Sequence, residues 1–236
     1  MSQSVLGFLQ ARMGSTRLPG KVLLRLEGKT ILERAILRLQ AARTVDAVVV
    51  LTTILEADDA LEEEARRLGV EAYRGPDQDV LRRFQQAAAK FRPDIVVRAT
   101  ADNPLIDIGS VERIVRAVQT SCLEYCVENN LPIGAATEAL TARALQRVDS
   151  LATHPFHREH VTLYIKEHPE LFRVAFLAPP DVLCRPDVRI TVDTPGDFMF
   201  VEELIHGVPE AAVPLPLEHF LPCADALCRA RKRAVQ

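Results

Sequence analysis

The chain has 236 residues, within the range of one large α/β domain, so residues 1–236 are expected to form a single domain. Of these residues 48% are apolar, enough for a sizeable core, and the formal net charge is −3. Domains that bind nucleic acid are usually basic, so this charge argues against nucleic acid as the partner of the protein as a whole.

The first half of the chain alternates short apolar runs with amphipathic patterns, as parallel α/β sheets do. Thr30 and Glu33 have the spacing of a capping box at the start of the first helix, and Gly69 is placed to end the second. We therefore predict an α/β fold of three layers (α/β/α), with a mostly parallel sheet. Strands are predicted at 5–9, 47–51, 70–73 and 95–98, and helices at 30–40, at 58–68, from the break at 75–77 to 90, and around 111–118.

The pattern becomes irregular after residue 120. Pro195 suits the first turn of a helix, so the segment 194–197 is predicted to begin a helix that reaches about residue 205. The proline-broken tail after Gly207 ends in the basic run 229–233, for which we expect a frayed, solvated end. The other predicted elements are strands at 123–127 and 171–177, helices at 137–148 and 155–167, and a strand at 188–192 that returns to the main sheet.

The segment from Gln10 to Lys21 follows the first predicted strand and combines positive charge with glycine. Glycine lets backbone N–H groups approach a ligand closely, and cations offset phosphate charge. A nucleoside triphosphate carries about four negative charges, so several cations must converge to hold it in a partly dry site. The alternative is a basic loop that is merely solvated, but the glycines and the position after a strand favour a phosphate site. The cations are Arg12, Arg17 and Lys21, and the glycines are Gly14 and Gly20.

Asp102 follows the fourth predicted strand, and ligands of parallel sheets bind outside the carboxyl ends of the strands. A carboxylate beside a triphosphate is unfavourable unless a divalent cation lies between them, and Mg²⁺ is typically held by one or two carboxylates together with phosphate oxygens. Asp102 is therefore a candidate metal ligand. The alternative is a turn aspartate that bonds its own backbone before Asn103-Pro104. Asp107 is expected to cap the next helix.

Two other motifs carry weaker signals. His154, His157 and His160 recur at spacings of three, but no carboxylate or cysteine pattern accompanies them, so contacts with a substrate or an interface are favoured over a transition metal. Asp77 and Asp79 have the D-x-D form of metal-dependent glycosyltransferases. Because they precede a helix after a glycine–proline break, N-capping is the favoured interpretation.

The segment 10–21 contains the pattern Q-A-R-x-x-S-T-R-L-P-G-K, which resembles the first-strand signature of the sugar-activating cytidylyltransferases, the group of the CMP-sialic acid and CMP-Kdo synthetases. The resemblance is strongest to the spore-coat polysaccharide cytidylyltransferase-like branch. It is also clear near Asp102 and at 191–197, which is similar to V-D-T-P-E-D with Gly196 in place of the glutamate. It is weak from about 121 to 150.

This resemblance implies a Rossmann-like sheet of the nucleotide-diphospho-sugar transferase type, with a small arm at 121–180, inserted before the last strand, that serves substrate binding or dimerisation. It implies transfer of CMP from CTP to a sugar or sugar acid, with release of pyrophosphate, in the synthesis of polysaccharide or glycoconjugate precursors. The expected partners are CTP and a small sugar or sugar acid, the expected cofactor is Mg²⁺ or another divalent cation such as Mn²⁺, and the expected assembly is a homodimer.

By the same resemblance, Arg12 and Lys21 contact the triphosphate, while Asp102 and Asp193 hold the metal ion. These four residues are the expected catalytic set, and the two aspartates can meet only if both segments end at one edge of the sheet. The nucleotide-binding residues are expected to be Gln10, Ala11, Arg12, Gly14, Ser15, Arg17 and Lys21, with Arg74 near the cytosine; Glu138 and Arg158 are the candidates for acceptor binding.

Two other functions stay open. A metal-dependent glycosyltransferase that uses a nucleotide sugar would favour Asp77 and Asp79 as ligands, and a catalytically silent module would bind the nucleotide without turnover. No stretch approaches the roughly 20 apolar residues of a membrane span. Residues 1–10 lack a signal-peptide pattern, and five cysteines without a C-x-x-C pair indicate reduced thiols. A cytoplasmic protein is therefore expected.

Overall fold

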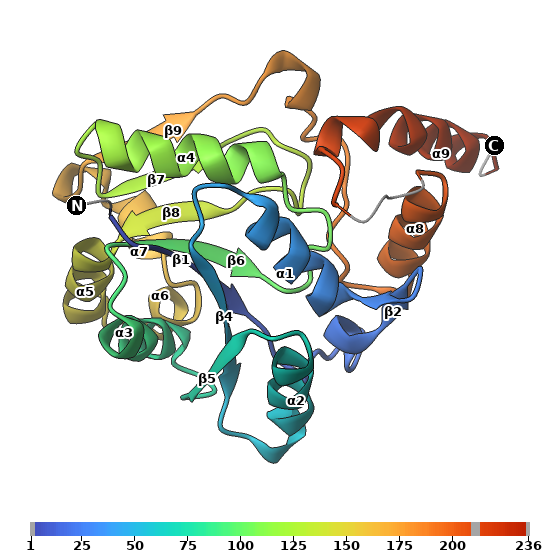
Figure 1. Cartoon of the computed structure of the whole chain (residues 1–236). Coiled ribbons are helices and arrows are strands. Elements are labelled where there is room, and N and C mark those ends of the chain that lie inside the picture. The colour runs from blue at the N-terminus through green and yellow to red at the C-terminus, as the bar shows by residue number, and fades with distance from the viewer. Residues whose placement is uncertain (1–2, 209–212, 235–236) are drawn as a thin grey trace.

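The computed structural model of the chain describes residues 3–208 and 213–234. Its centre is a seven-stranded sheet with the order β5-β4-β1-β6-β8-β7-β9 (Figure 1). In this sheet β8 runs antiparallel to both of its neighbours, and the other pairs are parallel. The strands are β1 (Val5–Gln10), β4 (Ala47–Thr53), β5 (Glu71–Gly75), β6 (Ile95–Thr100), β7 (Tyr125–Glu128), β8 (Glu138–Thr141) and β9 (Val174–Leu177).

Helices cover both faces of the sheet, so the predicted three-layer arrangement is confirmed (Figure 1). Alternate residues of the buried strands point to opposite faces, and each face has its own apolar cluster. Leu9 and Val97 face one cluster, whereas Phe8 and Val96 face the other. The first cluster is covered by α1 (Ile31–Ala41), α2 (Asp59–Arg67) and α4 (Ile108–Thr120), and the second by α3 (Val80–Phe91), α5 (Ala142–Leu151) and α7 (Leu163–Glu167), with α6 (Pro155–Glu159) beside α3.

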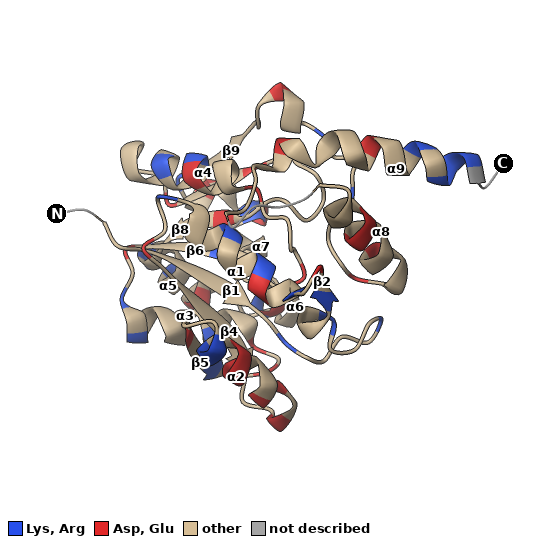
Figure 2. Ribbon diagram, turned by 45° about the vertical axis from the view of Figure 1, so that its right-hand side comes forward, with Lys and Arg blue, Asp and Glu red and all other residues tan. Residues whose placement is uncertain are grey.

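A third apolar cluster joins the end of the chain to the hairpin β2 (Arg25–Leu26) and β3 (Lys29–Thr30). Here α8 (Pro195–His206) packs against α9 (Leu221–Ala234), so the basic run 229–233 is helical and not frayed, although its residues are exposed as predicted. The reason is that α9 also has an apolar side, which the cluster buries. Charge adds to this contact: α8 is acidic where α9 ends in basic residues (Figure 2), and Arg231 lies 3.4 Å from Glu203. Residues 209–212 of the tail lie outside the described part.

Local capping signals predicted the helix starts well. Asp107 accepts the backbone N–H of Ser110 at the start of α4, and Asp79 caps α3 in the same way. Thr194 opens α8 with a complete capping box. At Thr30 only half of the predicted box forms: its hydroxyl oxygen accepts the backbone N–H of Glu33, but the Glu33 carboxylate bonds Arg67 instead. The Glu33 carboxylate thus forms an ion pair with a residue of another helix instead of accepting the backbone N–H of Thr30.

The helix predicted at 137–148 begins only at Ala142, because Glu138–Thr141 forms β8. This short segment is enclosed between β6 and β7, so ladder hydrogen bonds and burial on both faces decide its conformation. The helix predicted at 155–167 is divided into α6 and α7 by a turn at Val161, where φ is 46°.

The segment 188–192 does not return to the main sheet, contrary to the prediction. It makes only an isolated bridge between Ile133 and Arg189, and its apolar side chains are buried in the third cluster beside α8. The region 121–180, predicted as an arm, contributes β7, β8 and β9 to the main sheet. None of the helices in the described ranges is long and apolar enough to cross a membrane. All five cysteines are free thiols.

Candidate functional site

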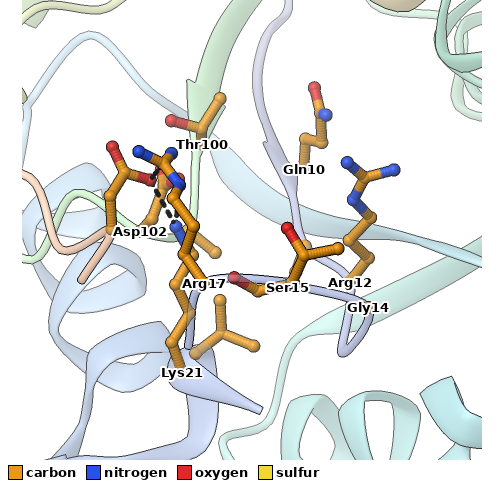
Figure 3. A pocket seen from close by; sticks show the side chains of 13 residues that line it. Gln10, Arg12, Gly14, Ser15, Arg17, Lys21, Thr100 and Asp102 are labelled. Atoms are coloured by element: carbon orange, nitrogen blue, oxygen red, sulfur yellow. Dashed lines mark hydrogen bonds and ion pairs between the residues drawn. The ribbon is translucent and has the colours of Figure 1, made fainter. Parts of the chain in front are cut away.

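The site lies where β1 and β6 end. These strands are adjacent and parallel, with Gln10 and Thr100 in register, so the loops that follow both strands leave the same edge of the sheet. Together with the segment before α8 they enclose a cavity of about 290 Å³ (Figure 3). This is the edge at which open α/β sheets bind their ligands. The cavity is lined by Gln10, Ala11, Arg12, Gly14, Ser15, Thr16, Arg17, Lys21, Val22, Thr100, Ala101, Asp102 and Asp193.

The loop after β1 is folded around the backbone of Met13. The Met13 carbonyl oxygen accepts the N–H groups of Ser15 and Gly20 at 2.8 and 3.1 Å. Gly20 has φ 67°, a left-handed conformation that glycine adopts at no steric cost. The Met13 N–H donates to Asp58 Oδ1 at 2.7 Å, and this buried carboxylate also bonds the backbone and hydroxyl of Thr53. Asp58 thus anchors the loop from 45 positions away, and no local pattern in the sequence indicates that role.

Two polar groups of the cavity wall are available to a ligand. Arg12 is exposed and forms no ion pair within the described part of the chain, and Gln10 Oε1 is buried without a hydrogen-bond partner there. Figure 3 shows Gln10 and Arg12 on one side of the cavity and Arg17 and Asp102 on the other, with Ser15 between them. A buried acceptor without a donor is costly, so Gln10 is suited to receive an N–H or O–H from a ligand.

Lys21 joins the two candidate metal ligands. Its Nζ lies 2.9 Å from Asp102 Oδ2 and 2.8 Å from Asp193 Oδ1, and its side chain is only 10% exposed. Asp193 is contacted by two further cations, Arg17 at 3.0 Å and Arg189 at 2.6 Å. Burial raises the pKa of Asp193, but the hydrogen bond and charge of Lys21 and the charge of Arg17 outweigh it and lower the pKa below its usual value. Sequence reasoning missed Arg189, whose only signal is its spacing of four from Asp193.

Backbone contacts bring the two aspartates together. The Val192 N–H donates to the Asp102 carbonyl oxygen at 2.9 Å, and the Ile133 carbonyl oxygen accepts the N–H groups of Ile190 and Thr191. At Gly134, where φ is 101°, an added Cβ would lie 2.6 Å from the Thr191 nitrogen. The predicted meeting of the two segments therefore occurs, although the second segment is held by a loop and not by a sheet ladder.

Three predicted site residues lie outside this cavity because other side chains bind them. Arg74 is paired with Asp59 at 2.5 Å and Glu62 at 3.2 Å and does not line the cavity. Arg158 and Glu138 are also bound elsewhere: Arg158 bridges α3 and α5, through Asp79 at 2.7 Å and Asp149 at 2.6 Å, and Glu138 is buried in ion pairs with Arg98 and Lys166. The acceptor assignments of Glu138 and Arg158 therefore find no support in this cavity.

The weaker motifs are also accounted for. Asp79 caps α3 with one carboxylate oxygen and accepts from Arg158 with the other, so it is not free to act as the second ligand of a D-x-D motif. His157 bonds Glu167 at 2.7 Å. In the described ranges no group of three or more His, Cys, Asp or Glu side chains could hold a metal ion.

Asp102 and Asp193 still fit a divalent cation that shares its coordination with a ligand. Both carboxylates already converge on one cationic atom, Lys21 Nζ. Mg²⁺ is usually bound by one or two carboxylates plus substrate phosphates, and not by a cage of protein ligands. Two carboxylates beside a basic loop are the donor set that this coordination requires.

Comparisons with known proteins agree with this geometry. A family model described as cytidylyltransferase matches residues 6–223. The chain is 40% identical over 200 residues to an uncharacterised protein of Methanocaldococcus jannaschii, covering 85% of this chain and 82% of that protein. It is 35% identical over 211 residues to the spore coat polysaccharide biosynthesis protein SpsF of Bacillus subtilis, covering 87% of this chain and 88% of that protein. It is 30% identical over 187 residues to a 3-deoxy-manno-octulosonate cytidylyltransferase of Anaeromyxobacter dehalogenans, covering 72% of this chain and 73% of that protein.

Solved structures show the same fold. A cytidylyltransferase from Leptospira borgpetersenii superposes with a TM-score of 0.88 at 31% identity, covering 97% of this chain and 96% of that one. A CMP:2-keto-3-deoxy-manno-octonic acid synthetase complexed with CTP superposes with a TM-score of 0.68 at 19% identity, covering 86% of this chain and 99% of that one.

Proposed function

The chain belongs to the cytidylyltransferase family, and from this premise we propose that its cavity binds CTP and transfers CMP to a hydroxyl group of a sugar acid. The observation that carries the proposal is the convergence of Lys21, Asp102 and Asp193 below a loop with two further arginines. Three cations and two carboxylates at one sheet edge suit a triphosphate with its metal ion.

The reaction is a substitution at the α-phosphorus of CTP. The acceptor hydroxyl oxygen bonds to this phosphorus, the bond between the phosphorus and the oxygen that bridges to the β-phosphate breaks, and pyrophosphate leaves with the electron pair. The hydroxyl proton passes to water. Such a reaction needs positioning and stabilisation of charge, and no covalent protein nucleophile.

The three cations of the loop lie at different points around the cavity. Arg12 and Arg17 rise from the loop on opposite sides of Ser15, so they reach the triphosphate from two directions (Figure 3). Lys21 lies deepest and meets the phosphates beside the two carboxylates. Gln10 Oε1 accepts a hydrogen bond from the nucleoside, because it is the buried acceptor in the cavity wall without a donor in the described residues.

Asp102 and Asp193 would hold Mg²⁺ or Mn²⁺, which when bound offsets the charge of the phosphate oxygens. Arg189 keeps Asp193 aimed at the cavity, since it bonds both Asp193 and the helix-capping Asp197. One solved structure with this fold, from Mycobacterium tuberculosis and at 18% identity, is a complex with manganese, but that likeness concerns the fold alone.

The test is pyrophosphate release from ATP, CTP, GTP and UTP, each with 3-deoxy-manno-octulosonate, N-acetylneuraminate and neutral hexoses. We expect release with CTP and a sugar acid in the presence of Mg²⁺. Release of a nucleoside phosphate from a nucleotide sugar would instead indicate a glycosyltransferase. CTP binding without pyrophosphate release from any combination would indicate a silent nucleotide-binding module.

We also propose that residues 121–180 form the contact of a homodimer. Five large apolar side chains of this segment are exposed, and β9 is an edge strand in the described sheet. Edge strands and apolar patches are typical places of association. Light scattering over a range of concentrations should give the mass of a dimer, and a concentration-independent monomer mass would contradict the proposal. The five side chains are Ile133, Leu151, Phe156, Leu171 and Phe176.

A further inference from the structure

A second cavity lies beside the nucleotide cavity on the same face of the sheet. It is lined by Arg98 of β6 and by residues of α6, α7 and the turn between them. Arg98 and Thr100 are two positions apart on one strand, so their side chains leave the same face, about 6.5 Å apart along the strand. Thr100 lines the nucleotide cavity. The lining residues of the second cavity are Arg98, Phe156, His160, Thr162, Leu163 and Lys166.

Positive charge exceeds negative charge in this second cavity. Arg98 and Lys166 are neutralised by a single carboxylate, that of the buried Glu138, at 2.6 and 2.5 Å. Each Glu138 oxygen already accepts two hydrogen bonds or ion pairs, with Tyr125 and Thr162 completing the set. Glu138 has therefore no remaining capacity for further donors, whereas the cations keep N–H groups that it does not use.

Arg98 shows this surplus directly. Its Nη1 bonds Glu138, but its Nε is buried and has no hydrogen-bond partner among the described residues. Burying an unpaired donor of a charged group is costly, so the site is incomplete without an acceptor. Lys166 can supply a second donor, since its side chain is 40% exposed and lines the same cavity.

The turn above the cavity is strained. Val161 has φ 46°, a conformation that is rare for a β-branched residue, and its neighbours His160 and Thr162 both line the cavity. Such strain is concentrated at functional sites. Phe156, which is 53% exposed, packs against the His160 ring with centroids 4.4 Å apart, so it offers a flat apolar wall at the rim.

We propose that this cavity is the acceptor subsite, in which Arg98 and Lys166 bind the carboxylate of the sugar acid while Phe156 covers an apolar face of the sugar. The inference rests on the proposed function, because it takes the neighbouring cavity as the place of the nucleotide. Arg98 of β6 and Lys166 of α7 then select acidic acceptors, and Glu138 holds both cations in position.

The experiment compares each sugar acid with its methyl ester, which keeps the sugar and removes the charge. Calorimetric titrations use the full chain saturated with CDP, with 3-deoxy-manno-octulosonate and N-acetylneuraminate as probes. The wild-type protein should bind at least one acid at least tenfold more tightly than its ester. In Lys166→Met this preference should fall to about threefold or less, while Lys166→Arg should keep it.

The matched control is Lys90→Met, an exposed lysine on α3 that lines neither cavity, and it should keep the wild-type preference. If Lys166→Met does not fold, the double variant Glu138→Gln/Lys166→Met, which removes both charges of one ion pair, takes its place.

Several results would overturn the inference. They are equal binding of acid and ester, binding of neither acid by the wild-type protein, and an acid preference that survives Lys166→Met. If only glucose 1-phosphate binds, and its binding depends on Lys166 in the same way, the cavity binds a phosphate group and the proposed binding of a carboxylate is overturned. CTP affinity is measured for every variant. A wild-type protein that does not bind CTP would contradict the proposed function instead.

Discussion

Lys21 Nζ lies 2.8 Å from Asp193 Oδ1, across 172 positions of sequence, and the same nitrogen lies 2.9 Å from Asp102. A lysine between two carboxylates keeps them close together in the absence of any other cation. Asp102 and Asp193 are also the two residues that would hold a divalent cation. We therefore expect Lys21 and a metal ion to compete for these oxygens before nucleotide binds.

The first prediction concerns this competition. Without nucleotide, Lys21→Met should bind Mn²⁺ at least tenfold more tightly than the wild-type protein, because a positive charge next to both carboxylates is removed. Electron paramagnetic resonance of free Mn²⁺ measures the affinity, and Lys90→Met is the control for loss of one lysine. Equal Mn²⁺ affinity of all three proteins would show that Lys21 does not compete with the metal.

The second prediction concerns Asp193. Asp193→Asn should lower the rate of pyrophosphate release by about 100-fold or more, because a group that stabilises charge at the reacting phosphate is lost. The variant should still unfold cooperatively, since Asp193 lies at the cavity and not in the apolar core. Asp181→Asn, at an exposed position, is the matched control. Unchanged turnover at saturating Mg²⁺ would remove Asp193 from the site.

The third prediction concerns Gly134, which lies against the segment that carries Asp193. Gly134→Ala places a Cβ 2.6 Å from the Thr191 nitrogen and requires a left-handed alanine, so the free energy of unfolding should fall by about 3 kcal/mol. Turnover should fall as well, because Asp193 moves with Thr191. Urea denaturation and pyrophosphate release measure the two effects. Gly196→Ala, where the nearest atom is 3.8 Å away, should change neither by much.

The fourth prediction concerns pH. Burial raises the pKa of Glu138, but the charges of Arg98 and Lys166 outweigh it and lower the pKa to about 2, against an ordinary value of 4.5. Between these two pH values the unfolded chain binds a proton at this residue and the native protein does not, so acid destabilises the native state. The contribution, about 3 kcal/mol, is complete above pH 4.5 and is lost as the pH falls through about 2.

Glu138→Gln should therefore be less stable than the wild-type protein at pH 7, since two cations lose their counter-charge, and the difference should shrink as the pH falls from 4.5 to 2. Denaturant titrations at several pH values measure it, with Glu63→Gln on the exposed side of α2 as the control. A difference that stays constant with pH would show that the Glu138 carboxylate is not held in its charged form.

Features that depend on neighbours within a few positions could be predicted from the amino-acid sequence. The helix starts at Asp107 and Thr194 followed from spacings of three residues, because a cap and its backbone partner are close in sequence. The basic loop after β1 and the parallel half of the sheet were predicted for the same reason: charge, glycine content and apolar periodicity are local properties.

Which polar groups remain available to a ligand depends on long-range contacts in the folded protein. Arg74 and Arg158 are cations of the kind that bind anionic ligands, but carboxylates from other elements form ion pairs with them. Arg98, by contrast, keeps a buried N–H that has no partner in the described chain. Asp193 reaches Asp102 through backbone hydrogen bonds and through the close approach that Gly134 permits. Ion pairs between distant residues and contacts between backbone segments far apart in sequence produce no local pattern in the amino-acid sequence. They therefore cannot be predicted from it and are seen only in the folded protein.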